Sequence, residues 1–164
     1  MAAAIGGNCH NRAVRVTAKV DYAVRALVEL AAAPTTTVKG DRLAQAQDLP
    51  VKFLENILAE LRRHGIVASQ RGSDGGYRFA KAPDTITVAD VIRAVEGPLA
   101  DVHGTPPEDL DPPGAAAPVR ELWLATRVAL RSVLERVTIA DLAAGTLPAE
   151  ITALLDVPDA WARR

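Results

Sequence analysis

The stretch 67–81, VASQRGSDGGYRFAK, constrains the fold of this chain more than any other part of its sequence. It directly follows an amphipathic segment, 53–65, that ends at a glycine. Residues 66–70 and 77–80 predict two short strands, and the glycines between them permit the positive φ angles of a tight connection. A helix followed at once by a glycine-rich hairpin that carries arginines is the layout of a winged helix-turn-helix. That layout favours nucleic-acid reading over catalysis.

Apolar spacing predicts further helices around this unit. Thr17 is a suitable N-cap for a first helix, and Pro34 lies beyond its end. Thr87 and Asp90 resemble a capping box at the start of another helix. The expected helical segments of this part of the chain are 18–33, 41–47, 51–64 and 88–96.

The helix expected at 51–64 has two distinct faces. Leu54, Ile57, Leu58 and Leu61 recur at helical spacing and predict a buried stripe. At 100° per residue, the opposite face carries Lys52, Asn56, Ala59 and Arg63, with Phe53 and Glu55 on its flanks.

The second half of the chain begins with a break in the pattern. Residues 101–118 hold five prolines, two glycines and four acidic residues, which predicts a non-helical loop. Residues 119–137 then predict one long helix, whose apolar stripe is wider than a small domain covers. We therefore expect a partner helix, most simply from an identical chain. Shorter helices are expected up to residue 144 and at 148–155.

The fold class expected is mainly α with a small β-wing: a winged helix-turn-helix domain plus a long C-terminal dimerisation helix. The expected division is a disordered tail (1–14), the DNA-binding domain (15–98), a Pro-rich acidic loop (99–118) and a helical dimerisation region (119–164). The chain of 164 residues is 49% hydrophobic, which is enough for a real core.

The net charge of −1 hides an uneven distribution. Residues 1–38 carry +2, residues 39–81 carry +3, and residues 82–164 carry −6. Attraction to phosphate is a local property of a surface, so the near-neutral total does not argue against DNA binding. No apolar run approaches membrane-spanning length and no export signal is evident, so a cytoplasmic protein is expected.

Three segments carry a specific resemblance: VTAKVDYAVRALVELA (16–31), LPVKFLENILAELRRHGIVASQRGSDGGYRFAK (49–81) and ITVADVIRAVEGPLA (86–100). They resemble the Rrf2 family of bacterial winged-helix transcription regulators, which includes the iron–sulfur cluster regulator. The resemblance implies a homodimer that binds double-stranded DNA at a palindromic operator, usually as a repressor. The resemblance also allows for a small-molecule effector, whose identity the sequence does not give.

The resemblance also implies which residues face DNA. The start of the recognition helix would supply Pro50, Lys52, Phe53, Glu55 and Asn56, and the helical wheel independently turns Lys52, Asn56 and Arg63 outward. Arg71 would reach the minor groove from the wing, and Thr17 and Lys19 would lie near phosphates. On the long helix, the expected dimer interface consists of Leu122, Thr126, Leu130, Val133 and Val137.

One departure from the family pattern concerns cofactors. Many members bind an iron–sulfur cluster through three cysteines in the loop before the long helix, whereas residues 101–118 contain none and the chain has a single cysteine, Cys9. Such clusters are normally held by several thiolates. We therefore expect no cluster and no other cofactor.

Other readings of these residues remain open. Lys52, Asn56 and Arg63 could form an ordinary solvated face, and Glu55 could either accept from a cytosine or lie on the surface without a role. Phe53 is expected to pack on the first helix with partial exposure, and a thymine-methyl contact is the alternative. The rival function is a winged-helix protein-interaction module that no longer reads DNA. An enzyme is not expected, because the three histidines lack a matched nucleophile and acid.

A few remaining residues suggest sites only weakly. His103 lies among acidic residues whose irregular spacing favours a solvated loop over a metal site. Trp123 is expected in a core or interface rather than in an effector pocket. The family resemblance begins at Arg15, so residues 1–13, with Cys9 and His10, are expected to be a dispensable tail or a mis-annotated extension.

Overall fold

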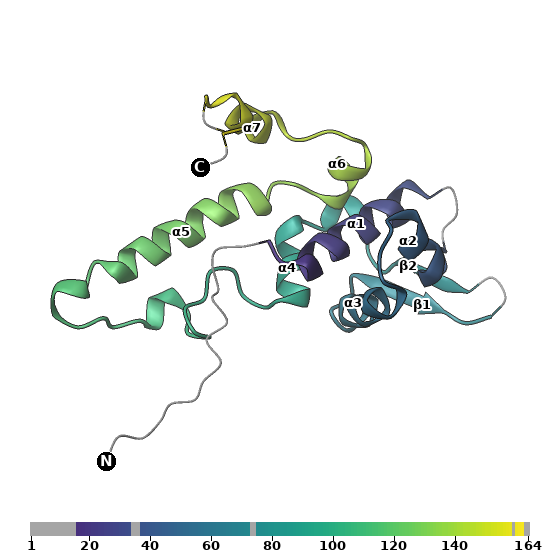
Figure 1. The fold of residues 1–164 in the computed structure, drawn as a ribbon, viewed down its shortest axis with the longest axis horizontal. Coiled ribbons are helices and arrows are strands. Elements are labelled where there is room, and N and C mark those ends of the chain that lie inside the picture. Colours follow the sequence, from purple (N-terminus) through teal and green to yellow (C-terminus); the bar gives the residue numbers. More distant parts are fainter. Residues whose placement is uncertain (1–15, 34–36, 73–74, 159, 163–164) are drawn as a thin grey trace, which may run out of the picture.

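The computed structural model describes residues 16–33, 37–72, 75–158 and 160–162 of the chain. A body of helices carries a two-stranded sheet, and one long helix extends away from it (Figure 1). The elements in chain order are α1 (Ala18–Ala32), α2 (Gly40–Ala46), α3 (Val51–Arg63), β1 (Val67–Gln70), β2 (Gly76–Phe79), α4 (Val88–Val95), α5 (Val119–Leu134), α6 (Ile139–Ala143) and α7 (Ala149–Thr152). Short 3-10 turns, η1 (Pro83–Thr85), η2 (Pro107–Asp109), η3 (Gly114–Ala116) and η4 (Ala153–Asp156), lie between or after them.

The core lies where α1, α3 and α4 pack together. Thr17 caps α1 as expected, because its side chain accepts a hydrogen bond from the backbone N–H of Val20. The predicted buried stripe of α3 is confirmed: Leu54, Ile57, Leu58 and Leu61 are all buried. Burial of such side chains contributes roughly 1.5–3 kcal/mol each, so this stripe fixes which face of α3 remains outside.

The turn between α2 and α3 is held against α1 by hydrogen bonds. Arg25 donates to the side-chain oxygen of Gln47 at 3.2 Å and also contacts its carbonyl oxygen. The Gln47 amide in turn donates to Glu29 at 2.9 Å. Leu49 is buried just after the turn, and its N–H donates to Ala44 at 2.8 Å. These contacts fix the angle at which α3 leaves the turn.

The hairpin of β1 and β2 is antiparallel, with Val67 opposite Phe79 and Gln70 opposite Gly76. Val38 adds a bridge on the outer side of β2, exchanging backbone hydrogen bonds with Tyr77 at 2.8 and 2.9 Å. A Cβ at Gly76 would lie 2.5 Å from the Val38 carbonyl oxygen, so this close approach requires glycine.

The chain after α5 returns to the body of the molecule. Thr87 and Thr138 form an isolated bridge, in which Val88 donates to Val137 and Ile139 donates to Ile86, both at 2.9 Å. Each of the two threonines opens its helix with a capping box, as predicted for Thr87. Ile139 is fully buried in the same core as α1 and α3, so α6 packs on the winged-helix body although it follows the long helix.

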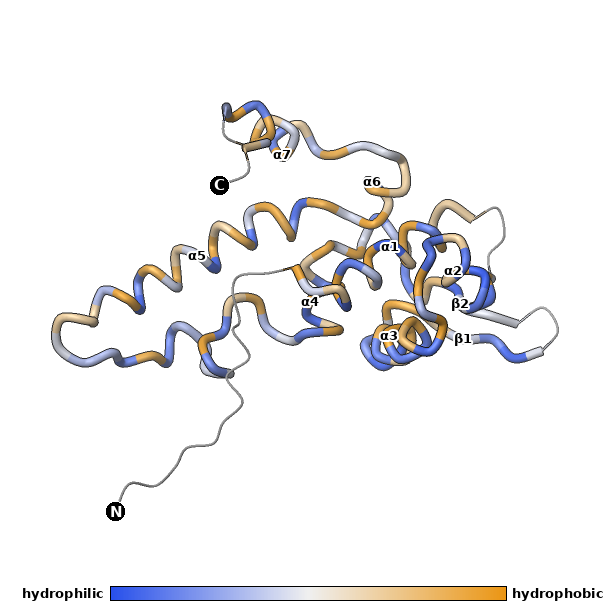
Figure 2. The backbone as a smooth tube through the Cα atoms, viewed as in Figure 1, coloured by the Kyte–Doolittle hydropathy of each residue, from blue (hydrophilic) through white to orange (hydrophobic). Residues whose placement is uncertain are grey.

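Helix α5 differs from the others because none of its residues is buried. It contacts only η2 and α4 appreciably, and it projects away from the end of the body that carries the hairpin (Figure 1). Apolar residues recur along it (Figure 2). Leu122 is 57% exposed, and Val128 is 64% exposed. None of the helices in the described ranges is long and apolar enough to cross a membrane.

Several element boundaries differ from the sequence expectation. Helix α5 ends at Leu134 rather than at residue 137, because the next residues turn to join the bridge beside α4. The Pro-rich loop contains η2 and η3, since a 3-10 turn tolerates proline at its first position, as in η2, and at its N-cap, as in η3. Strand β1 begins one residue later than expected and ends where expected, whereas β2 begins and ends one residue earlier than expected. The expected disordered tail lies outside the described residues.

Candidate nucleic-acid interface

The outer face of α3 carries the polar residues that the sequence placed there. Lys52, Glu55, Asn56 and Arg63 are exposed, while the apolar stripe on the other side of the helix is buried. Pro50 is the N-cap residue of α3 and is exposed as well. The start of α3 therefore presents a donor-rich surface to solvent, with Glu55 as its acidic member.

Phe53 lies at the edge of this surface and packs on α1. Its ring meets the ring of Tyr22 edge-to-face, with centroids 5.7 Å apart and planes at 88°. Phe53 is still 40% exposed. The expectation of packing with partial exposure is confirmed, and the contact steadies the first turn of α3.

The hairpin is fastened to α3 close to its outer face. Arg62 near the end of α3 donates to the Ser69 hydroxyl of β1 at 3.1 Å. Arg71 lies just beyond β1 and is exposed. Arg78 of β2 is exposed opposite Ala68, and it donates to its neighbour Phe79. The alternation in Tyr77–Arg78–Phe79 is the sequence signal that could have pointed to Arg78 as a further outward cation.

Lys19 and Thr17 have partners within the chain. The Lys19 ammonium lies 2.7 Å from Glu60 of α3 and donates to the Val95 carbonyl at 2.5 Å. The Thr17 hydroxyl donates to Glu96 at 2.9 Å. In the DNA-free chain two acceptors hold the charge of Lys19, and its position near a DNA phosphate stays a prediction. Lys19 acts here as a support for α3 and α4.

The expected dimer residues fall into two groups. Leu122, Thr126, Leu130 and Val133 follow one another at spacings of three and four on α5, and all are exposed or half-buried. Val137 is different: only 5% of it is exposed, and its carbonyl accepts the N–H of Val88. The structure thus places Val137 against the chain's own body, because α5 has ended before it.

The other weak candidates are not brought together into a site. In the described ranges, no three His, Cys, Asp or Glu side chains approach one another closely enough to hold a metal ion. His103 is exposed in the loop, and Trp123 is half-buried on α5. Cys9 and His10 lie outside the described residues.

Comparison with sequence families gives a match over most of the chain. The Rrf2 family, described as "Iron-dependent Transcriptional regulator", matches residues 16–145. Rv1287 of Mycobacterium tuberculosis, named as a candidate HTH-type transcriptional regulator, is 46% identical over 87% of this chain and 89% of its own length. The HTH-type transcriptional regulator CymR of Bacillus subtilis is 36% identical over 81% of this chain and 92% of its own.

Solved structures agree with this assignment. The structure of CymR, the global cysteine regulator of B. subtilis, superposes with a TM-score of 0.67 at 34% identity, covering 80% of this chain and 98% of that one. The IscR structure from T. potens gives a TM-score of 0.65 at 30% identity, covering 80% and 87% of the two chains. Together with the winged-helix body, these matches show that the chain belongs to the Rrf2 family of HTH-type transcriptional regulators.

Proposed function

We propose that this regulator acts as a homodimer that binds a palindromic operator in double-stranded DNA and represses transcription in the cytoplasm. The start of α3 would enter the major groove, and the wing would contact the adjacent backbone or minor groove. The reading residues would be Lys52, Glu55 and Asn56, with Arg71 on the wing. The edge of the contact would be formed by Pro50, Phe53, Arg63, Thr17 and Lys19.

The observation that carries the proposal is the outward face of α3 beside an anchored wing. Lys52 and Asn56 are exposed while the opposite stripe is buried, so the helix has one face left for a groove. The bond from Arg62 to Ser69 holds β1 against the same helix. Because the reader helix and the wing are fixed to each other, they form one rigid surface that can match one DNA geometry.

The free stripe of α5 supports dimerisation. Leu122 is more than half exposed and lies on a helix that buries no residue within its own chain. A second copy that packs along Leu122, Thr126, Leu130 and Val133 would cover this stripe and place two reader helices on two half-sites. Repression follows the family resemblance, since a dimer seated near a promoter blocks polymerase.

We also propose that the chain works without an iron–sulfur cluster. The family description implies iron, but a cluster requires several thiolates and the chain has only Cys9. The donor set of the loop 101–118 consists of carboxylates and one histidine, which does not fit such a cluster. The signal that this regulator senses must then be something other than the state of an iron–sulfur cluster.

The test is a selection of bound duplexes from random DNA with the full chain, followed by affinity measurements at several salt concentrations. Wild type should enrich one palindrome. Arg71→Ala should weaken binding, and Lys52→Ala should lower the salt slope by about one phosphate contact. Arg120→Ala is the matched control, because Arg120 is an exposed cation on α5, away from α3.

Glu55→Ala should relax the base preference at one position of each half-site, since a carboxylate that accepts from cytosine discriminates among bases. A chain that enriches no sequence would favour the alternative, a winged-helix module that contacts proteins. Equal losses in Lys52→Ala and Arg120→Ala would reject the proposed DNA surface while leaving DNA binding itself in place.

A further inference from the structure

A shallow cavity of about 430 Å³, largely open to solvent, lies between the end of α4 and the middle of α5. Its lining consists of Arg93 from α4, residues 97–99, and Arg127 and Arg131 from α5. All of the charged side chains in this lining are arginines, and Leu99 with Pro98 supplies an apolar part. Small-ligand sites commonly have volumes of roughly 300–1,000 Å³ and combine apolar walls with a few polar groups. The volume of the cavity lies within this range, and its lining combines three arginines with a small apolar part.

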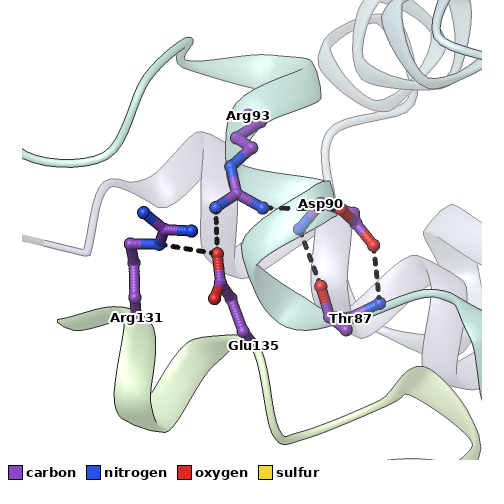
Figure 3. A network of polar contacts seen from close by, with 5 residues as sticks. All are labelled: Thr87, Asp90, Arg93, Arg131 and Glu135. Carbon is purple, nitrogen blue, oxygen red and sulfur yellow. Dashed lines mark hydrogen bonds and ion pairs between the residues drawn. The ribbon is translucent and has the colours of Figure 1, made fainter. Parts of the chain in front are cut away.

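Carboxylates beside the cavity hold the three arginines in place (Figure 3 shows two of them). Glu135 accepts from Arg93 and, at 2.9 Å, from Arg131, and Asp90 lies 3.5 Å from Arg93. Glu108 lies 2.5 Å from Arg127. None of these carboxylates belongs to the cavity lining. They therefore orient the guanidinium groups without filling the space between them.

Donors remain available for a ligand. A guanidinium has five N–H donors in a planar fork that matches carboxylate and phosphate oxygens. The contacts found in the described part of the chain involve one nitrogen of Arg127 and one of Arg131. The C-terminal end of α4 carries a partial negative charge, which repels an anion. This charge is only about half a unit, so it is smaller than the positive charge of one arginine.

We propose that this cavity binds a small molecule with a carboxylate or phosphate group, and that this ligand is the effector of the regulator. The anionic group would sit between Arg127 and Arg131, with Arg93 at the side, and an apolar portion would rest on Leu99. The effector role rests on the proposed DNA-binding function, whereas the binding site rests on the cavity alone.

The cavity is connected to the DNA-reading helix through α4. Arg93 lines the cavity, and two residues later the Val95 carbonyl accepts from Lys19, whose ammonium also pairs with Glu60 of α3. A ligand that attracts Arg93 competes with Glu135 and shifts the balance of contacts at the end of α4. Such a ligand changes DNA affinity to the extent that it prefers one of the two arrangements.

The binding test uses the full chain without DNA and follows the arginine Nε–Hε signals by NMR. The probes are succinate, inorganic phosphate and, as a neutral control, succinamide at matched ionic strength. Succinate or phosphate should shift the signals of Arg93, Arg127 and Arg131, and the more effective of the two identifies the anionic group. Absence of shifts with both anions, or equal shifts with succinamide, would overturn the site.

Variants locate the binding. Arg131→Gln should weaken the affinity for the effective anion by roughly tenfold or more, because it removes charge-assisted hydrogen bonds. Arg127→Lys keeps the charge but loses the planar fork, and it should also weaken binding. Arg120→Gln is the control on the same helix, since Arg120 does not line the cavity. An equal effect of Arg120→Gln would mean that the anion responds only to the overall charge of the protein and not to the cavity.

The effector role has a separate readout. With the operator selected above, the effective anion should change the DNA affinity of wild type by several-fold and that of Arg131→Gln much less. An unchanged affinity of anion-saturated wild type would overturn the effector role. A chain that binds the anion but no DNA would instead refute the proposed function and leave the site standing.

Discussion

Lys19 and Glu60 form an ion pair, with 2.7 Å between the ammonium nitrogen and a carboxylate oxygen, that joins the first turn of α1 to the far half of α3. The same ammonium donates to the Val95 carbonyl at the end of α4. Both side chains are largely shielded, with 28% and 24% of their areas exposed. One residue thus connects the three helices that determine where the outer face of α3 points.

Replacing Lys19 with methionine should destabilise the folded chain by roughly 1–3 kcal/mol, because Glu60 would keep a partly buried charge without its main partner. Urea unfolding followed by circular dichroism measures this loss. Lys81→Met is the control, since the Lys81 side chain is exposed. Equal stability of the two variants would show that the ion pair contributes no more than an ordinary surface pair.

Gly76→Ala should loosen the wing. The added Cβ would meet the Val38 carbonyl at 2.5 Å, and the bridge between Val38 and Tyr77 would have to open. We expect a loss of roughly 1–3 kcal/mol in stability and a weaker contact between wing and DNA. Gly104→Ala separates the steric clash from backbone strain, because Gly104 also has a positive φ but no atom lies within 4 Å of an added Cβ. A loss no larger than that of Gly104→Ala would mean that the hairpin accommodates the methyl group.

Leu122→Glu should convert the dimer into monomers. The melting temperature of this monomer should be nearly the same as that of a dissociated wild-type chain. Leu122 is already 57% exposed in the single chain, so a charge there has little cost until a second copy must cover it. Analytical ultracentrifugation checks the assembly, and operator binding should fall with it. Ser132→Glu adds the same charge at another exposed position of α5. A dimer that survives Leu122→Glu would place the interface elsewhere.

Acidification should release α5 from α4. Hydrogen bonds from Arg93 and then Arg131 hold the pKa of Glu135 below its ordinary value of 4.5. A carboxylate whose pKa is lowered in the folded state stabilises the fold above its ordinary pKa, and this contribution disappears as the pH falls through the lower value. A carbon-detected NMR titration should show Glu135 protonating below pH 4.5. Arg93→Gln should raise that pKa, whereas Arg120→Gln should leave it in place.

Local patterns in the sequence were sufficient for the winged-helix body and for the outward face of α3. The periodicity of Leu54, Ile57, Leu58 and Leu61 determines which side of α3 is buried, because apolar area drives that choice, and Lys52 and Asn56 follow on the other side. The caps at Thr17 and Thr87 likewise depend on side chains within three residues of the helix start.

Contacts between distant residues were decided only by the tertiary structure. The partner of Lys19 is Glu60, 41 positions away, and the partner of Arg93 is Glu135, 42 positions away. Local sequence spacing therefore predicts neither ion pair. The same holds for Val137, which the bridge beside Thr87 places against the body instead of on the long helix, and for the burial of Ile139 in the core of the body. Sequence periodicity specifies which face of a helix is apolar. Which surface covers that face, and which cations line a cavity, depends on how the whole chain packs.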